Sequence, residues 1–274
     1  MNGKERIAII GAGNIGASIA EGLARHGGFP PKNITVTRRK IGLLDGMKAR
    51  GFVVEKDNKA AVSNSEIVVI AVEPQQLDKL LDEIGGILIP GRHILISVVS
   101  GVSIKDISAK IAPGVAVVRA MPNIAIAVSE SITCLASDSG GSDAVPVAED
   151  IFKTVGVTLV IDEEQMTAAT ALGACGIAFF LRAIRAASQG GIEAGFHSNE
   201  ALYIAAQTAK GAASLLLSAN HHPEYEIDRV TTPRGCTIAG LNQMEYEGFS
   251  SAMIKGITVS ADKASRLYAK GKKE

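Results

Sequence analysis

The sequence predicts a doubly wound α/β domain over residues 1–162 and an all-helical domain over residues 163–274. Before Asp162, short β-branched runs alternate with amphipathic segments, as in a parallel sheet whose strands are connected by helices. After Asp162 these runs stop, and alanine, leucine and glycine recur at helical spacing. A chain of 274 residues is long enough for two such domains.

The expected strands are apolar runs without alternation, because a parallel strand is covered on both faces. They are residues 7–10, 34–37, 52–54, 67–72, 94–99, 115–118, 132–135 and 158–161, and the first helix is expected at 15–25. Alternation of strand and helix over this stretch predicts that all these strands belong to one sheet.

In the second half, helices are expected at 164–190, 198–219, 223–229, 237–247 and 250–270. Ser198 is expected to begin the cap of the second of these helices, and Thr237 to cap the fourth. The first helix is apolar on nearly every side between Ala168 and Phe179, so it must be buried on several sides. We therefore expect this half to complete its core with another copy of the chain, as a homodimer or a larger oligomer.

Composition excludes several classes of function. Lys plus Arg and Asp plus Glu both number 28, so no overall charge favours nucleic acid or a membrane surface. The three cysteines are widely spaced and the five histidines have no carboxylate at ligand spacing, which predicts neither a disulfide framework nor a metal site. The longest apolar stretch, Ala171–Leu181, is too short to span a bilayer, and no signal peptide begins the chain. These features predict a cytoplasmic protein.

The segment Gly11–Gly16 has the GxGxxG pattern and lies directly between a strand and a helix. In that context Gly11 permits a tight turn, Gly13 lets the backbone approach a pyrophosphate, and Gly16 allows close packing of helix on strand. We therefore expect a dinucleotide site that also includes Ala12, Asn14 and Ile15. The alternative is a glycine-rich turn that binds nothing.

The second strand ends in Thr37, Arg38 and Arg39. A protein that prefers NAD usually has an acidic residue here, which accepts a hydrogen bond from the ribose 2′-hydroxyl. Two guanidinium groups instead favour a 2′-phosphate, so NADPH is the expected cofactor and NADH stays possible. The alternative is a solvated basic turn.

Other residues at strand ends are expected to face the same crevice, because ligands bind at the carboxyl ends of parallel strands. One group follows the fourth strand and a second follows the fifth. Together they are Ala71, Val72, Glu73, Pro74, Val98, Val99 and Ser100. Asn123 is expected to reach the nicotinamide amide, although a Pro-Asn pair is equally typical of an ordinary turn.

The most informative segment is Asp228–Glu245, which joins a polar loop to the start of a helix. Pro233 and Gly235 predict a turn, after which the N–H groups of residues 235–237 would point to one place beside the hydroxyls of Thr231 and Thr232. Such a helix start can hold a carboxylate. A capped helix with no ligand is the alternative.

These motifs resemble the pyrroline-5-carboxylate reductase family. The motifs Gly11–Gly16, Asn58, Ala71–Gln75, Arg119–Asn123 and Val230–Gly240 occur in that family's order over nearly the whole chain, and the last is the most specific. The resemblance implies NAD(P)H-dependent reduction of Δ1-pyrroline-5-carboxylate, a cyclic imino acid, to L-proline. It also implies a Rossmann domain, a helical dimerisation domain, and dimers that commonly assemble into decamers.

The resemblance also assigns roles to matching positions. Thr237 corresponds to the catalytic position at the substrate ring nitrogen, and Thr232, Gly235 and Cys236 lie along the carboxylate-binding loop. Asn58 joins Thr37 and Arg38 at the adenosine-phosphate end of the cofactor site.

Three positions depart from the family. Glu73 replaces a usual lysine, Ile177 a usual proline and Arg234 a usual glycine, which bears on cofactor preference and substrate more than on reaction class. Two other functions stay open: a reductase of a related imino acid or a β-hydroxyacid, and a dinucleotide sensor without activity. The absence of lysine from Met166 to Ser188 counts against the β-hydroxyacid enzyme, which would present a lysine there.

Overall fold

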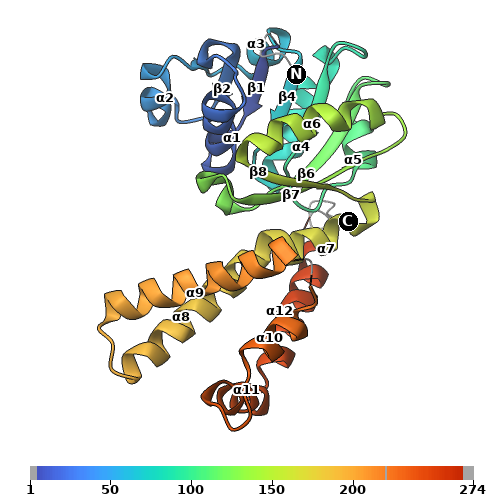
Figure 1. The fold of residues 1–274 in the computed structure, drawn as a ribbon. Helices are drawn as coiled ribbons and strands as arrows, with labels where there is room; N and C mark the ends of the chain where they lie inside the picture. Colours follow the sequence, from blue (N-terminus) through green and yellow to red (C-terminus); the bar gives the residue numbers. More distant parts are fainter. Residues whose placement is uncertain (1–4, 220, 268–274) are drawn as a thin grey trace. The chain divides into compact units, whose positions relative to one another are not determined.

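The computed structural model describes residues 5–219 and 221–267. The chain divides into two compact units (Figure 1): Met1–Cys175 with Ser260–Glu274, and Gly176–Val259. The first unit therefore extends past the boundary predicted at residues 162–163. Packing explains this extension, because Met166 is buried against Met121, Cys134 and Ala136 of the sheet.

The first unit contains one eight-stranded sheet in the order β3-β2-β1-β4-β5-β6-β7-β8. All neighbouring strands are parallel except β6 and β7, which are antiparallel. The strands are β1 (Ile7–Ile10), β2 (Ile34–Thr37), β3 (Val53–Glu55), β4 (Ile67–Ile70), β5 (Ile94–Ser97), β6 (Ala116–Met121), β7 (Ser131–Ser137) and β8 (Gly156–Val160). The strand order reverses between β1 and β4, which places a crevice at the carboxyl ends of these two strands.

Helices cover both faces of this sheet. They are α1 (Asn14–His26), α2 (Asp45–Ala49), α3 (Asn58–Ser63), α4 (Pro74–Ile84), α5 (Ile104–Ser108), α6 (Val145–Phe152) and α7 (Met166–Ala169), with short 3-10 turns between them. Along β1, Ile7 and Ile9 pack into a core with α1 and α6, whereas Ala8 and Ile10 pack into a second core with α3, α4 and α5. Two-sided burial explains why these strands are continuously apolar.

Every predicted strand is present, with ends that shift by a few residues. The strand predicted at 67–72 stops at Ile70, because Glu73 is the N-cap of α4 and Pro74 is its first residue. The strand predicted at 115–118 continues to Met121, where Met121 pairs with Cys134 of β7. The fold class predicted from the sequence is confirmed by this sheet and by the helical second unit.

The second unit is helical. It contains α8 (Gly176–Glu193), α9 (Ser198–Ala219), α10 (Pro223–Val230), α11 (Cys236–Tyr246) and the larger part of α12 (Phe249–Ala264). The chain turns back between α8 and α9, which lie side by side (Figure 1). Their contact is close at Gly191, where a Cβ atom would lie 3.1 Å from the Cβ of Ala201.

Three helix predictions need correction. In place of the single helix predicted at 164–190, the structure has α7, then a π-helical turn over Thr170–Cys175, and then α8. Ser198 is the first residue of α9, and the contact at this end is a hydrogen bond of 3.1 Å from the His197 N–H to Glu200 Oε2. The helix predicted at 250–270 ends at Ala264, and residues 268–270 lie outside the part of the chain that the structure describes.

The helical segment Glu163–Glu193 is long and apolar enough, by length and composition alone, to cross a membrane. The sequence prediction rested on the apolar residues 171–181, whereas the helical segment continues beyond both ends of that stretch. A core or interface helix of a soluble protein passes the same test. The segment contains Arg182 and Arg185, and charged side chains within a bilayer are costly.

His93 is a buried titratable residue next to β5. It is only 2% exposed, and its Nδ1 accepts a hydrogen bond of 2.8 Å from the Ile89 N–H, which requires this nitrogen to be unprotonated. Burial and then the charge of Arg92 lower the pKa of His93 below its ordinary value of 6.5, and nearby backbone carbonyls oppose this only in part. The neutral form is therefore favoured in the folded protein.

This arrangement predicts a pH-dependent stability. Because the folded pKa lies below the unfolded one, the contribution of His93 is complete above pH 6.5 and is lost as the pH falls. The free energy of unfolding should drop by no more than about 1.4 kcal/mol per pH unit through this residue. Urea unfolding at several pH values from 8 to 5 measures this slope, and His93→Asn should flatten it. The same change at the exposed His26 is the control, and parallel curves for wild type and His93→Asn would refute the prediction.

Candidate functional site

The glycine loop has the geometry of a dinucleotide site. Gly11 has a φ of +99°, and a Cβ atom there would lie 2.6 Å from the backbone oxygen of Ala71. Gly16 packs equally closely against the Gly11 carbonyl, whereas no atom lies within 4 Å of the place where a Cβ of Gly13 would be. Gly13 is also the N-cap of α1, so the open space at Gly13 lies at the start of a helix. The loop therefore fits a pyrophosphate at this point.

A cavity of about 1040 Å³ opens beside this loop, at the carboxyl ends of β1, β2 and β4. Nine predicted cofactor residues line it: Gly11, Gly13, Thr37, Arg38, Arg39, Asn58, Ala71, Val72 and Glu73. The other nine lie outside its lining: Ala12, Asn14, Ile15, Gly16, Pro74, Val98, Val99, Ser100 and Asn123. Ala12 and Gly16 are buried, so they shape the loop from beneath.

The cavity lining also includes Gln75, which ends the segment 71–75 that was expected at the crevice, and eight residues that sequence reasoning missed: Ile10, Lys40, Leu43, Lys56, Gln76, Lys79, Leu80 and Glu83. Lys56 had a usable signal, because it directly follows the strand that neighbours β2. Glu83 had none, since it lies at the far end of α4 from the strand that leads into this helix.

Three polar side chains connect different elements along the cavity wall. The Thr37 hydroxyl donates to Asn58 Oδ1 at 2.9 Å, and Asn58 Nδ2 donates to the two carboxylate oxygens of Glu83 at 3.4 and 3.3 Å. Glu83 therefore fixes which way the amide of Asn58 points. At the start of α4, Glu73 accepts a hydrogen bond of 3.0 Å from Gln76.

Asn123 has a structural role in this unit. Its Nδ2 donates to the Gly173 carbonyl at 3.2 Å, inside the π-helical turn, and its Oδ1 accepts from the Ala125 N–H at 2.9 Å. Asn123 is also buried, and it does not line the cofactor cavity. Each side-chain polar atom of Asn123 therefore has a partner within the first unit, and its contact with a nicotinamide amide stays a prediction.

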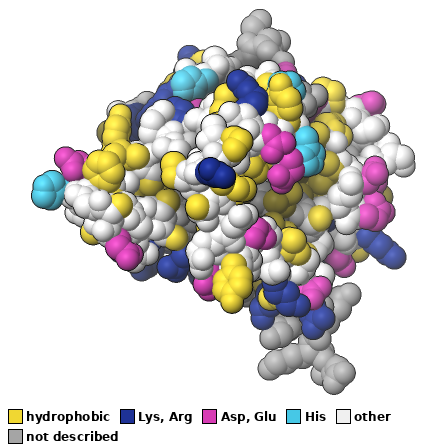
Figure 2. All heavy atoms as spheres, turned by 60° about the horizontal axis from the view of Figure 1, so that its bottom comes forward, with side chains coloured by type: hydrophobic (Ala, Val, Ile, Leu, Met, Phe, Trp, Pro, Cys, Tyr) yellow, Lys and Arg dark blue, Asp and Glu magenta, His cyan; other side chains and the backbone are white. Residues whose placement is uncertain are grey.

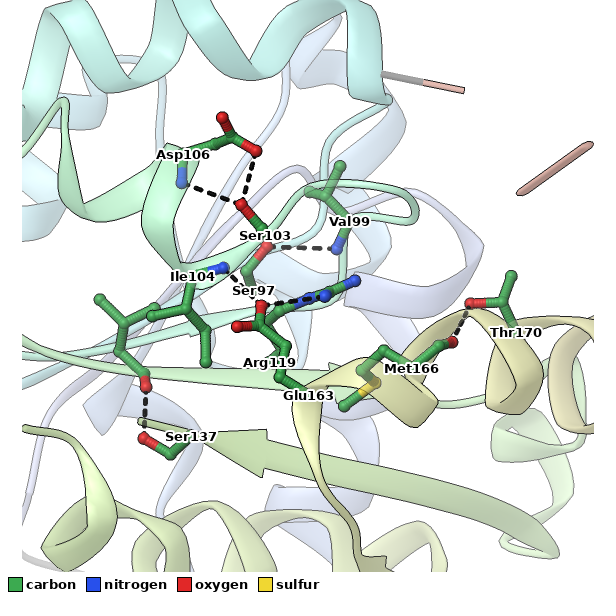
Figure 3. A network of polar contacts seen from close by, with 11 residues as sticks. Ser97, Val99, Ser103, Ile104, Asp106, Arg119, Ser137, Glu163, Met166 and Thr170 are labelled. Atoms are coloured by element: carbon green, nitrogen blue, oxygen red, sulfur yellow. Dashed lines mark hydrogen bonds and ion pairs between the residues drawn. The ribbon is translucent and has the colours of Figure 1, made fainter. Parts of the chain in front are cut away.

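A partly buried ion pair stabilises the end of the first unit (Figure 3). Arg119 on β6 is 8% exposed and donates to Glu163 Oε1 at 3.1 Å, while the same oxygen accepts a hydrogen bond of 2.6 Å from the Ile104 N–H at the start of α5. Ser103 caps α5 by accepting from the Asp106 N–H at 3.0 Å. Glu163 therefore connects the sheet, α5 and the beginning of the segment that leads to α7.

The loop before α11 forms a tight turn. The Gly235 N–H donates to the Thr232 carbonyl at 2.9 Å across Pro233 and Arg234. Arg234 has a φ of +59°, the left-handed region, which is typical of the third residue of a type II turn after proline. Glycine adopts this region without steric cost, which explains why Arg234 stands out as a departure from the family's pattern.

Thr237 is not the N-cap of α11, so that prediction was wrong. The N-cap is Gly235, which has an extended backbone and no side-chain cap, and Cys236 begins the helix. The N–H groups of Cys236 and Thr237 therefore belong to the first turn, where helix N–H groups have no partner within the helix. The Thr231 hydroxyl already donates to the Ile227 carbonyl at 2.7 Å.

The described ranges 5–219 and 221–267 contain no group of three His, Cys, Asp or Glu side chains placed to hold a metal ion. Burial raises the pKa of the Cys134 thiol, which opposes formation of a thiolate there.

Comparisons with known proteins identify the family. The family described as pyrroline-5-carboxylate reductase dimerisation matches residues 163–267, and the one described as NADP oxidoreductase coenzyme F420-dependent matches residues 6–101. Pyrroline-5-carboxylate reductase 2 of Dictyostelium discoideum is 45% identical over 98% of this chain and 95% of its own length. The chain belongs to the pyrroline-5-carboxylate reductase family.

Two further comparisons agree with this assignment. Pyrroline-5-carboxylate reductase 1 of Dictyostelium discoideum is 53% identical over 96% of this chain, which spans half the length of that relative. The structure of a pyrroline-5-carboxylate reductase from Coxiella burnetii superposes with a TM-score of 0.88 at 28% identity, covering 96% of this chain and 98% of the other. The two-unit architecture described above is therefore that of the family.

The strained turn at Arg234 gives a stability prediction. Arg234→Gly should raise the free energy of unfolding by up to about 1 kcal/mol, because the left-handed conformation costs a residue with a Cβ about 1–2 kcal/mol and the greater freedom of unfolded glycine offsets part of this. Thermal unfolding is the measurement. Arg234→Ala is the matched control, since it removes the guanidinium and keeps the strain. An equal shift in both variants would show that charge, not backbone conformation, governs the effect.

Proposed function

We propose that this protein reduces Δ1-pyrroline-5-carboxylate to L-proline, with NADPH as the preferred hydride donor and NADH as a possible second one. One observation carries the proposal: the 45% identity with a curated pyrroline-5-carboxylate reductase of nearly the same length. The structure adds a cavity of suitable size and an open glycine loop in the N-terminal unit.

The residues of the first unit would bind and orient the cofactor. Gly13 and the start of α1 fit the pyrophosphate, and Arg38 and Arg39 supply positive charge where an adenosine 2′-phosphate would lie. NADPH supplies a hydride when it is bound. The protein contributes mainly orientation, because a cyclic imine that is protonated on nitrogen is already an electrophile.

The residues of the loop before α11 would bind the substrate. The N–H groups at the start of α11, together with the Thr232 hydroxyl, provide donors for the carboxylate of a small imino acid, whereas Thr231 holds the shape of the loop through its bond to the Ile227 carbonyl. Gly235 must stay small, because a Cβ there would lie 2.5 Å from the Thr232 hydroxyl oxygen. We infer that the Thr237 hydroxyl hydrogen-bonds the ring nitrogen, and that no single ionisable side chain is essential.

Replacement of Thr237 tests this assignment. Thr237→Val removes the hydroxyl while keeping the shape, and should lower kcat/KM by roughly tenfold to a thousandfold, the cost of one or two good hydrogen bonds. Thr237→Ser keeps the hydroxyl and is the matched control. The assay follows NADPH oxidation with pyrroline-5-carboxylate and with a six-membered cyclic imine. Wild-type activity in Thr237→Val would remove Thr237 from the site, and NADPH binding without turnover in wild type would contradict the proposed reaction.

We further infer that the protein is a cytoplasmic homodimer or homodecamer. Many large apolar side chains of the helical unit are exposed, among them Phe180, Leu181, Tyr203, Leu217 and Ile254. Figure 2 shows hydrophobic side chains at the surface among charged ones. Exposed apolar surface on this scale is typical of an interface, and the match of residues 163–267 to a dimerisation family supports the same conclusion.

Light scattering after size exclusion tests the assembly. The protein, purified from the soluble fraction without detergent, should have a mass of two or ten chains, and Leu181→Asp should shift it toward the monomer because a charge cannot be buried there without a partner. Glu193→Asp, on the same helix, is the control. A monomer in wild type, or a protein found only in the membrane fraction, would contradict this proposal.

A further inference from the structure

The cofactor cavity has an unbalanced set of charges. Its lining contains five cationic side chains, Arg38, Arg39, Lys40, Lys56 and Lys79, against the carboxylates of Glu73 and Glu83. Both carboxylates receive hydrogen bonds from neutral amides, those of Gln76 and Asn58. Within the described ranges, none of the five cations forms an ion pair with a carboxylate. Unpaired cations gathered on one cavity indicate an anionic ligand with more than one phosphate.

The register of the sheet places two of these cations together. β2 and β3 are parallel, and their last pair is Thr37 with Glu55. Arg38 and Lys56 directly follow this pair, so both residues lie just beyond the same edge of the sheet, at the ends of neighbouring strands. Strands that pair lie about 4.8 Å apart, which is close enough for two side chains to contact one phosphate. Lys79 instead belongs to α4, on another wall of the cavity.

The backbone around Lys56 is fixed on both sides. Glu55 Oε1 accepts hydrogen bonds from the N–H groups of Lys56 at 2.7 Å and Asp57 at 3.0 Å. Asp57 then caps α3 by accepting from the N–H groups of Lys59 at 2.8 Å and Ala60 at 3.3 Å. The two acidic neighbours of Lys56 therefore bind backbone groups. The position of Lys56 at the cavity is set by the fold before any ligand arrives.

We propose that Lys56 acts with Arg38 as a two-strand clamp for the 2′-phosphate of the adenosine half of NADPH, so that β3 as well as β2 determines cofactor preference. This inference rests on the proposed function for the identity of the cofactor. A phosphate held between a guanidinium and an ammonium group gains charge-assisted hydrogen bonds from both, whereas a ribose 2′-hydroxyl has no charge for them to neutralise. Removing Lys56 should therefore weaken binding of the phosphorylated ligand selectively.

The experiment measures binding of two adenosine probes by calorimetry, adenosine 2′,5′-bisphosphate and adenosine 5′-monophosphate. Lys56→Gln should weaken binding of the bisphosphate by about tenfold, as expected for one lost charge-assisted contact, and should change binding of the monophosphate by less than about twofold. Lys59→Gln is the matched control, because Lys59 is exposed, lies three residues away and does not line the cavity. It should leave both affinities unchanged, and circular dichroism should confirm that each variant is folded.

The outcomes separate this inference from the proposed function. If Lys56→Gln weakens the binding of both probes by the same factor, or weakens the binding of neither, the clamp is wrong and only the general charge of the cavity contributes to binding. If wild type binds neither probe, both the clamp and the proposed cofactor are wrong. If wild type prefers the bisphosphate and Lys56→Gln reduces that preference by about tenfold, the clamp is supported even where the imine assay detects no NADPH oxidation.

Discussion

Two-sided burial of the parallel sheet is the constraint on which the rest of this structure depends. Each residue of β1 is buried, with Ile7 and Ile9 in one core and Ala8 and Ile10 in the other. Burying one isoleucine side chain contributes about 1.5–3 kcal/mol, so a shift of β1 by one residue would exchange both faces at once. The register of the neighbouring strands β2 and β4 is fixed in the same way, and with it the place where these strands end.

The cofactor cavity follows from this constraint. Gly11, Thr37 and Ala71 lie at the ends of β1, β2 and β4, and the N–H groups of Gly11 and Ala12 donate to the Thr37 carbonyl at 3.2 and 2.8 Å. Charged residues beyond these ends are thus held by a rigid edge. The contact of Arg119 with Glu163 fixes the end of β6 in a similar way. A single carboxylate oxygen of Glu163 accepts hydrogen bonds from both the guanidinium and the N–H at the start of α5. Burial makes such a shared acceptor hard to replace, because an unpaired charge there would be costly.

The sheet was predictable from the sequence because its signal is local. Apolar runs, the glycine loop and Pro74 each act within a few residues, and eight strands were expected where eight occur in the described part of the chain. The π-helical turn at Thr170–Cys175 was not predictable, since its released Gly173 carbonyl is satisfied by Asn123, fifty residues away. The cap of α11 was misplaced because Thr237 has the right chemistry for an N-cap, whereas the turn from Thr232 to Gly235 decides where the helix begins. Lys56 follows an expected strand, but its position beside Arg38 required the pairing of β2 with β3, which no local pattern states.

The turn before α11, where we propose that the substrate carboxylate binds, has a further consequence for recognition. Its backbone is held by the bond from Gly235 to Thr232 and by the bond from the Thr231 hydroxyl to Ile227, and Arg234 stays in the left-handed region under these restraints. A loop that is already ordered loses little conformational entropy when a small ligand binds. A cyclic imino acid has few atoms and can offer only a handful of contacts. Because the loop becomes rigid when the protein folds, most of the free energy of those contacts is available for affinity.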